Sequence, residues 1–485
     1  MKRILFLIVA ASAFLSYACS QPLQTPTEKT GFTQPANYEQ IRQFCEEAAL
    51  LHDQLELDIF GQSAEGRDLL VIKAKNPKVS DSETLRVLFF AQQHGNEQAS
   101  KEGSLLLIRD LAEGKYDHWL QRMEIWIVPQ VNPDGGEENR RANSMNLDLN
   151  RDHVVMQAPE TRALHALFRG FMPHVSIDVH EYQPYRQAWS NYGGYKQFDV
   201  QVGVTTNINI DQTIQQYSLN QVLDHIERHL TDRGFSFHNY LVGPPPSEGI
   251  TRHSTVDIND GRQSFGILQT MSFIYEGING RDGFAENLAH RSQGQLEAKL
   301  ALMNYMYENH HEVVSMVNKA REMMISGKMP ETVAIRTGYF PGEEPLELPL
   351  KSSATGMDTI VIVDNYHPLV KPLLEVRRPM GYVLPAHDKK LIEWLDLHQI
   401  QYKNDLPSGV SVYACEAIER SQTPYAVKKV LSINQQDYVY VPVNQLHGNF
   451  LVLTLEPLSE LSIARLPLFS YLLDEYSMYP IHRVD

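Results

Sequence analysis

At 485 residues, the chain is too long for one small hydrophobic core, and two folded domains are the expected organisation. Hydrophobic residues make up 42% of it and charged residues 21%, which is ordinary for a globular protein and excludes a largely disordered chain. The 59 acidic residues outnumber the 43 basic ones, and the net charge of −16 argues against nucleic acid or an anionic membrane surface as the main partner.

Residues 1–18 have the pattern of a bacterial export signal. A basic start precedes an apolar run from Ile4 to Leu15, which is too short for a permanent membrane span. The pair Ala18-Cys19 resembles a lipoprotein cleavage site, and a lipidated Cys19 would tether the protein to a membrane. The small residues ahead of Cys19 would equally suit an ordinary signal peptidase. Both alternatives predict an exported protein that is periplasmic, membrane-anchored or secreted.

Strands and helices then alternate along the chain. Residues 19–37 are polar with several prolines and predict a linker, so the folded part is expected to start at residue 38. Apolar periodicity predicts helices at 38–52, 97–113 and 158–170, strands at 69–74, 85–91, 123–129, 174–179 and 268–276, and a turn or hairpin at 61–67. This alternation predicts an α/β fold with a mixed, largely parallel central sheet and helices on both faces.

An insertion and a change of texture mark the second half. Between Tyr182 and Gly266 the pattern loosens around a helix at 219–233, and a loop region of this length usually covers a functional site. A helical stretch at 284–325 closes the first domain, predicted at 38–328. Residues 329–485 are predicted to form a smaller β-rich C-terminal domain, with strands at 359–364, 438–443 and 449–455 and a strand-helix-strand unit at 381–403.

Two cysteines remain after the export segment. The spacing of Cys45 and Cys415 argues against a zinc knuckle or a redox pair. A long-range disulfide and two buried thiols are both open readings.

Five motifs with polar or charged residues follow the strands in order. The first motif, His94-Gly95-Asn96-Glu97, lies between a predicted strand and a predicted helix. Its histidine nitrogen and its carboxylate are one turn apart, a spacing that suits a divalent metal. Such spacing alone is close to chance. The other four are Asn132-Pro133-Asp134-Gly135, then Arg141-Ala142-Asn143 with Asp148-Leu149-Asn150-Arg151, then Asp178-Val179-His180-Glu181-Tyr182, and Ser272-Phe273-Ile274-Tyr275-Glu276.

Together the motifs supply the parts of a hydrolytic zinc site. Such a site needs three protein ligands and an open position, a carboxylate base and a cation for the developing oxyanion. The ligand set would be His94, Glu97 and His180. Glu276 is the candidate base, and Arg141 and Arg151 are the candidate cations.

This ordered set resembles the zinc metallocarboxypeptidase family, the carboxypeptidase A-like enzymes, over about residues 40–310. The resemblance implies one Zn²⁺ per chain held by His94, Glu97 and His180, with Glu276 as general base. It further implies an oxyanion-stabilising Arg141, a carboxylate-binding pair Asn150 and Arg151, an Asp148 that orients a zinc-binding histidine, and Tyr182 in the substrate pocket. Residues 38–328 would then be the catalytic domain and 329–485 an accessory domain.

The sequence also departs from the family pattern. Asn96 stands where larger members commonly carry arginine, which predicts a different substrate range. Tyr240 is one candidate for the family's mobile tyrosine, but the insertion prevents its assignment. The residue that sets side-chain preference cannot be placed for the same reason. Glu181 has no histidine four residues after His180, so it is expected to orient other groups or to lie in a loop.

These features support one leading function and two alternatives. The leading prediction is a zinc exopeptidase that removes the C-terminal residue of peptides with a free carboxylate. One alternative keeps this chemistry and acts on cell-wall stem peptides. The other is a non-catalytic zinc-dependent peptide binder, against which the presence of Glu276 argues.

Overall fold

The computed structural model describes residues 22–80, 84–416, 427–430, 433–474 and 478–485. The predicted export signal and Cys19 lie outside these ranges. Among the described residues, no helix is both long and apolar enough to cross a membrane.

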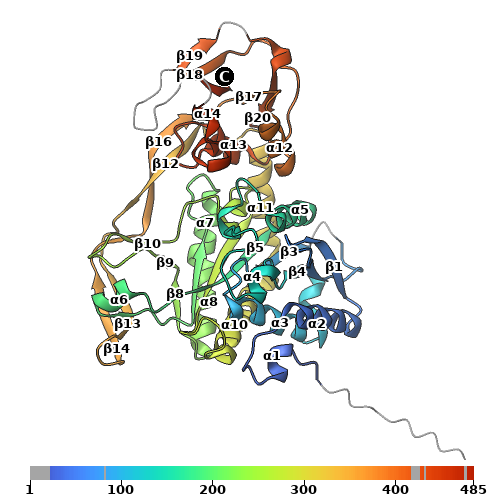
Figure 1. Cartoon of the computed structure of the whole chain (residues 1–485), viewed down its shortest axis with the longest axis vertical. Helices are drawn as coiled ribbons and strands as arrows, with labels where there is room; N and C mark the ends of the chain where they lie inside the picture. Colours follow the sequence, from blue (N-terminus) through green and yellow to red (C-terminus); the bar gives the residue numbers. More distant parts are fainter. Residues whose placement is uncertain (1–21, 81–83, 417–426, 431–432, 475–477) are drawn as a thin grey trace, which may run out of the picture.

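A mixed sheet forms the centre of the body (Figure 1). Eight of the described strands join in the order β1-β2-β4-β3-β5-β11-β7-β8. The four central strands β4, β3, β5 and β11 are parallel, while β1, β2 and β7 are antiparallel to their inner neighbours. The strands are β1 Leu55–Gln62, β2 Asp68–Ala74, β3 Leu85–Ala91, β4 Met123–Val128, β5 Val175–Tyr182, β7 Val200–Val204, β8 Phe237–Asn239 and β11 Met271–Ile278.

Helices cover both faces of this sheet. One face carries α2 Tyr38–Leu51, α3 Gln98–Ala112, α8 Leu223–Asp232, α10 Leu288–Glu308 and α11 His310–Ile325, and the other carries α5 Pro159–Phe171 and α9 Gly261–Gly266. Side chains alternate along β5. Val175, Ile177 and Val179 therefore pack into the hydrophobic core on the α3 side of the sheet, while Asp178 and His180 face the opposite side. The predicted fold class is therefore confirmed.

The N-terminal segment departs from the predicted linker. The short helix α1 Pro26–Lys29 packs onto α3, where Glu102 accepts hydrogen bonds from Thr27 Oγ1 at 2.6 Å and from the Ala36 amide at 2.8 Å. The Leu23 amide donates to Glu113 at 3.0 Å. Residues 22–37 are thus held to the body by polar contacts. Their polar composition predicted a tether, because composition alone does not reveal such contacts.

The insertion folds into short elements beside β7 and β8. These are α6 Gln187–Tyr192, β6 Gly194–Tyr195, α7 Gln212–Tyr217, β9 Leu241–Val242 and β10 Thr251–His253, and a π-helical turn at 218–222 joins α7 to α8. The insertion also pairs with the C-terminal part of the chain, because β6 pairs with β13 Leu346–Ser352 and β10 with β15 Tyr366–His367.

The C-terminal unit stacks on the α5 side of the body (Figure 1). It contains the ribbon β12 Thr332–Phe340 with β16 Leu369–Arg377, the hairpin of β13 with β14 Asp358–Val363, and a five-stranded sheet, as far as the chain is described. That sheet comprises β17 Gly381–Pro385, β18 Val412–Glu416, β19 Val427–Val430, β20 Tyr438–Pro442 and β21 Met478–Val484, with α12 Lys389–His398, α13 Gly448–Leu455 and α14 Tyr471–Asp474 beside it.

Two predictions for this unit are wrong. Residues 449–455 lie in the helix α13 rather than in a strand, because every side chain of this apolar run is buried and its composition carries no strand-like alternation. Residues 400–403 form no strand and make one isolated bridge, from Lys403 to Tyr440.

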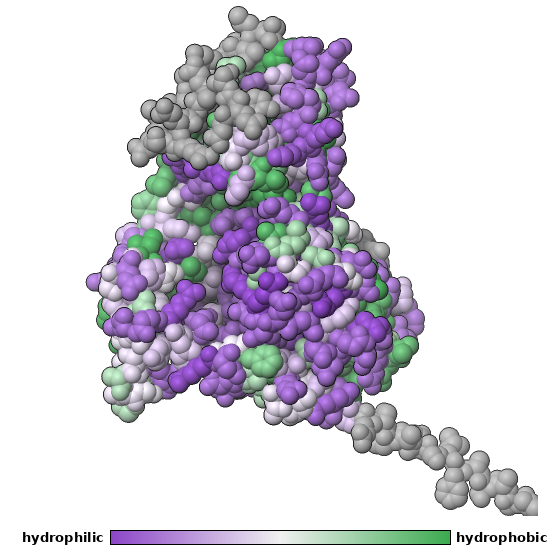
Figure 2. Space-filling model, in the orientation of Figure 1, coloured by the Kyte–Doolittle hydropathy of each residue, from purple (hydrophilic) through white to green (hydrophobic). Residues whose placement is uncertain are grey.

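The C-terminal unit shares one hydrophobic core with the body. Leu88 and Phe90 of β3 belong to the same buried cluster as Trp394 of α12 and Phe450 of α13. Figure 2 shows a largely hydrophilic outer surface on this face, with hydrophobic residues gathered toward the junction of the two parts. Elsewhere in the body, Cys45 is a free buried thiol whose pKa burial raises to about 12. The side chain of Cys415 lies outside the described part.

Candidate metal centre

The three predicted metal ligands meet at the carboxyl ends of β3 and β5. His94 and Glu97 lie between β3 and α3, and His180 lies near the end of β5. Nδ1 of His94 is 2.7 Å from Glu97 Oε1, and Nδ1 of His180 is 2.8 Å from Glu97 Oε2. One donor atom from each residue lies within 4.8 Å of the others, and all three side chains are buried. The structure therefore contains the His/Glu/His cluster that the sequence predicts.

The outer nitrogen of each histidine contacts a carboxylate. Nε2 of His94 is 3.0 Å from Asp148 Oδ1, and Nε2 of His180 is 2.8 Å from Asp178 Oδ1. Carboxylates in this position hold the ring orientation and favour a proton on Nε2. The Nδ1 lone pairs would then face inward, 3.1 Å apart and beside the Glu97 carboxylate. Such crowding of lone pairs is stable around a cation, so the donor set fits a zinc ion.

Electrostatics keep the acidic groups of the cluster ionised. Burial opposes ionisation of Glu97, but His94 and His180 outweigh it and hold the pKa of this carboxyl well below its usual range. Burial likewise opposes ionisation of Asp148, while His94 and Arg141 lower its pKa well below that of a free carboxyl. The ligand carboxylate is thus ready to bind a metal at neutral pH.

Glu276 lies on the neighbouring strand, directly opposite His180. The parallel register of β11 and β5 pairs these two residues. Glu276 is 8% exposed, and burial raises the pKa of its carboxyl although His180 lowers it. It accepts a hydrogen bond from the hydroxyl of Tyr240. A buried carboxyl beside the His/Glu/His cluster is placed to take part in proton transfer.

Three further predicted residues line the same end of the sheet. Arg141 is exposed, and its NH1 lies 3.3 Å from His94 Nδ1 while its Nε donates to Asp148 Oδ2 at 2.9 Å. Asn150 is buried, with Nδ2 3.1 Å from His180 Nε2 and Oδ1 accepting from the Gly261 amide at 2.7 Å. Arg151 is exposed as a residue, and its NH1 donates to the Asn150 carbonyl.

The remaining predicted residues contact structural neighbours. The hydroxyl of Tyr182 donates to the Phe198 carbonyl at 2.7 Å. Glu181 of β5 is buried; it accepts from the Ala99 amide at the start of α3 at 2.9 Å and pairs with Arg291 of α10 at 2.7 Å. Burial raises the pKa of Glu181 to about 7. The backbone carbonyl of Asn96 accepts from Asn279 Nδ2 at 3.3 Å.

The Asn132-Pro133-Asp134-Gly135 motif packs against the loop that carries His94 and hydrogen-bonds to it. Asn132 caps the short helix α4 Pro133–Glu137, and its Nδ2 donates to the carbonyls of Gln93 at 3.0 Å and Arg141 at 3.3 Å. Gly95 packs so closely on Gly135 that a Cβ at Gly95 would lie 2.1 Å from the Gly135 carbonyl carbon. The glycine in the first motif is therefore required by a backbone contact.

Two groups at the site were not predicted from the sequence as site residues. Asp178 orients His180, and a signal was present, because a residue two positions earlier on a strand shares its face. Gln93 donates from Nε2 to Asp178 Oδ1 at 2.8 Å and bonds His153 Nε2 through Oε1 at 2.8 Å. An amide side chain in a loop carries no sequence signal for such a role.

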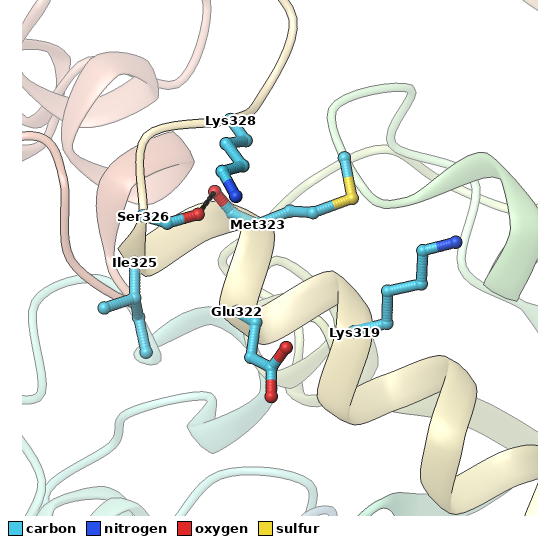
Figure 3. Close-up of a pocket in the computed structure, with 6 residues that line it drawn as sticks. All are labelled: Lys319, Glu322, Met323, Ile325, Ser326 and Lys328. Atoms are coloured by element: carbon cyan, nitrogen blue, oxygen red, sulfur yellow. Dashed lines mark hydrogen bonds between the residues drawn. The ribbon is translucent and has the colours of Figure 1, made fainter.

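A surface hollow of about 420 Å³ lies at the end of α11 (Figure 3). Its lining includes Lys319, Glu322 and Lys328, and Ser326 Oγ donates to the Met323 carbonyl at 3.4 Å. None of the predicted site residues lines this hollow, so it is separate from the metal centre.

Comparison with known proteins identifies relatives of this chain. Residues 41–221 match the zinc carboxypeptidase family model. Carboxypeptidase 2 of Trichophyton rubrum is 25% identical over 356 residues, which is 70% of this chain and 64% of that protein. A zinc carboxypeptidase of Saccharothrix mutabilis subsp. capreolus is 32% identical over 115 residues, covering 22% of this chain and 26% of that protein. The chain thus spans about 64% of the length of the fungal relative.

Solved structures of metallocarboxypeptidases also align with part of this chain. One from Pseudomonas aeruginosa has a TM-score of 0.44 at 18% identity and covers 57% of this chain and 70% of its own. Carboxypeptidase A of Helicoverpa armigera has a TM-score of 0.43 at 16% identity and covers 60% of this chain and 74% of its own. By the family match over residues 41–221 and by its carboxypeptidase relatives, the chain is similar to zinc carboxypeptidases.

Proposed function

We propose that this protein is a zinc-dependent exopeptidase that hydrolyses the C-terminal peptide bond of peptides with a free terminal carboxylate. One zinc ion per chain would be held by His94, Glu97 and His180. The observation that carries the proposal is the convergence of these three donors within 4.8 Å beside the register partner of His180, Glu276. The bound ion would supply Lewis acidity for the attack of water on the carbonyl.

The remaining steps are assigned to side chains. Glu276 accepts a proton from the attacking water and later donates it to the leaving amine. The exposed guanidinium of Arg141, 3.3 Å from His94 Nδ1, would stabilise the negative charge that develops on the carbonyl oxygen. Arg151 and Asn150 would bind the terminal carboxylate of the substrate, for which a planar guanidinium is suited. The amino-terminal sequence further suggests an exported enzyme.

Substitution of the proposed base tests catalysis separately from metal binding. Glu276→Gln keeps the size of the side chain but cannot accept the proton, so kcat should fall about a thousandfold while zinc content is unchanged. Turnover at the wild-type rate would contradict the assignment of Glu276 as the base. Loss of zinc from this variant would make Glu276 a ligand rather than a base.

The substrate class is tested with matched peptides. Peptides with a free C-terminal carboxylate should be cleaved, and the same peptides amidated at the C-terminus should react at least about a hundredfold more slowly, because Arg151 loses its anionic partner. Purified cell-wall fragments in the same mass-spectrometric assay distinguish the alternative substrate. Equal cleavage of free and amidated peptides would contradict the role of Arg151.

A further inference from the structure

A buried arginine beside the metal centre lacks acceptors for part of its guanidinium. Arg262, in α9, has 0% exposure. Its NH2 donates to Thr255 Oγ1 at 2.8 Å and to Asp260 Oδ2 at 3.1 Å. Its Nε and NH1 have no hydrogen-bond partner in the described part of the chain. Unpaired buried donors on a cation are costly, so their retention points to an acceptor that comes from elsewhere.

The guanidinium lies next to the strand that carries the proposed base. Gly203 of β7 pairs with Ile274 of β11, and a Cβ at Gly203 would lie 2.8 Å from Arg262 NH1 and 2.8 Å from the Ile274 side chain. Ile274 is two residues before Glu276 and therefore shares its face of the sheet. Because Gly203 has no side chain, it leaves space for the Arg262 guanidinium on this face of the sheet.

Tyr240 links Arg262 to the base. The Arg262 Cζ lies 5.7 Å from the centre of the Tyr240 ring, and the Tyr240 hydroxyl bonds Glu276. Tyr240 is partly exposed, whereas Arg262 is not. On the other side, the amide of Gly261 donates to Asn150, which contacts His180. Arg262 is thus bounded by residues that touch both the base and a metal ligand.

Asp260 does not use the free nitrogens of Arg262. Its Oδ1 accepts from the Gln263 amide at 2.7 Å as the cap of α9, and its Oδ2 accepts from Thr255 and from Arg262 NH2. The ion pair therefore fixes one nitrogen of the guanidinium in place. The remaining donors are available to a second carboxylate.

From this geometry we infer that Arg262 determines side-chain specificity and that the preferred substrates end in glutamate or aspartate. The inference rests on the proposed exopeptidase function. Arg151 and Asn150 hold the terminal carboxylate, and Arg262 binds the carboxylate of the last side chain. That side chain reaches the guanidinium by displacing Tyr240, which also releases the Glu276 carboxyl from its hydrogen bond.

The test compares peptides that differ only in the last residue, with the zinc-loaded protein. Wild-type kcat/KM should be at least about tenfold higher for a C-terminal glutamate than for glutamine or leucine, since a site built to bind a charged group rejects analogues that leave it unpaired. Arg262→Gln should lower kcat/KM for the glutamate peptide about a hundredfold and change the other two less than about threefold. Arg262→Lys, which keeps the charge, should retain part of the preference.

Arg252→Gln is the matched control. The Nε of Arg252 in β10 likewise has no hydrogen-bond partner among the described residues, but this guanidinium lies 4.9 Å from the ring of a different tyrosine, Tyr339. This variant should keep the glutamate preference. Wild-type cleavage of the glutamine peptide as fast as the glutamate peptide would overturn the inference, as would an equal loss on all three peptides in Arg262→Gln.

The two proposals fail differently. If the zinc-loaded wild type cleaves none of the free-acid peptides, the exopeptidase function itself is wrong. If it cleaves the leucine peptide but does not favour the glutamate peptide, only the assignment of Arg262 is wrong. The wild-type ranking decides this even where an Arg262 variant does not fold.

Discussion

Asp178 and His180, two residues apart on β5, face the same side of the sheet, and Asp178 Oδ1 lies 2.8 Å from His180 Nε2. The same oxygen accepts from Gln93 Nε2 at 2.8 Å. The imidazole of His180, the proposed metal ligand, is therefore oriented by a carboxylate that is itself held in place, an arrangement that would strengthen metal binding.

Asp178→Asn should weaken zinc binding by about tenfold to a hundredfold, because an amide neither fixes the ring proton nor raises the basicity of His180 as a carboxylate does. Competition with a metal-sensitive dye measures the affinity. Asp148→Asn makes the equivalent change at His94 and should weaken binding by a similar factor. Wild-type affinity in Asp178→Asn would show that this contact does not support the metal site.

Gly95→Ala should destabilise the fold by more than about 3 kcal/mol, since its Cβ would lie 2.1 Å from the Gly135 backbone, which cannot move aside easily. Urea denaturation measures the free energy of unfolding. Gly170→Ala is the control, because a Cβ at this helical glycine meets nothing within 4 Å and should raise stability by about 0.5–1 kcal/mol. Equal stability of Gly95→Ala and wild type would contradict the packing described.

Acidification should destabilise the protein through buried histidines at the junction of the body and the C-terminal unit. Burial lowers the pKa of His153 to about 4 and of His447 to about 3, and it also lowers the pKa values of His165 and His398. Unfolding restores values near about 6.5. The unfolded chain therefore binds more protons below that pH, so stability is complete above about pH 6.5 and is lost as the pH falls toward 4, by on the order of 3 kcal/mol from His153.

Urea denaturation between pH 5 and pH 7.5 measures this dependence. His398→Gln, which can still donate to the Val154 carbonyl, should flatten the pH dependence, because one buried titrating group is removed. His311→Gln at an exposed position should leave the dependence unchanged. A pH-independent free energy of unfolding in wild type would contradict the role of the buried histidines.

The C-terminal unit should support substrate binding through α12. Trp394 Nε1 donates to the Val154 carbonyl at 2.8 Å, three residues after Arg151. Trp394→Phe keeps most of the packing but removes this hydrogen bond, so kcat/KM for free-acid peptides should fall about threefold to tenfold through KM. Trp126→Phe, which removes the indole hydrogen bond to Glu124 within β4, should have no such effect. An unchanged KM in Trp394→Phe would show that α12 does not support substrate binding.

The sequence by itself predicted the α/β fold of the body and the residues of its His/Glu/His cluster. Residues His94, His180 and Glu276 each follow or end an apolar strand, and the carboxyl ends of neighbouring parallel strands must meet at one edge of a sheet. The spacing of His94 and Glu97 alone is close to chance, so it was the ordered set of five motifs and its resemblance to a known family that predicted which side chains converge.

The tertiary structure decided what local pattern does not encode. Residues 449–455 form a helix because the C-terminal unit and the body bury every side of it, so no periodic signal distinguishes it from a strand. Residues 22–37 are ordered by contacts to Glu102 and Glu113 on a distant helix. The proposed role of Arg262 depends on its tertiary neighbours Gly203, Ile274 and Tyr240, which the sequence does not place beside it. Burial and unpaired hydrogen-bond donors are properties of the packed molecule, and they arise from contacts between residues far apart in sequence.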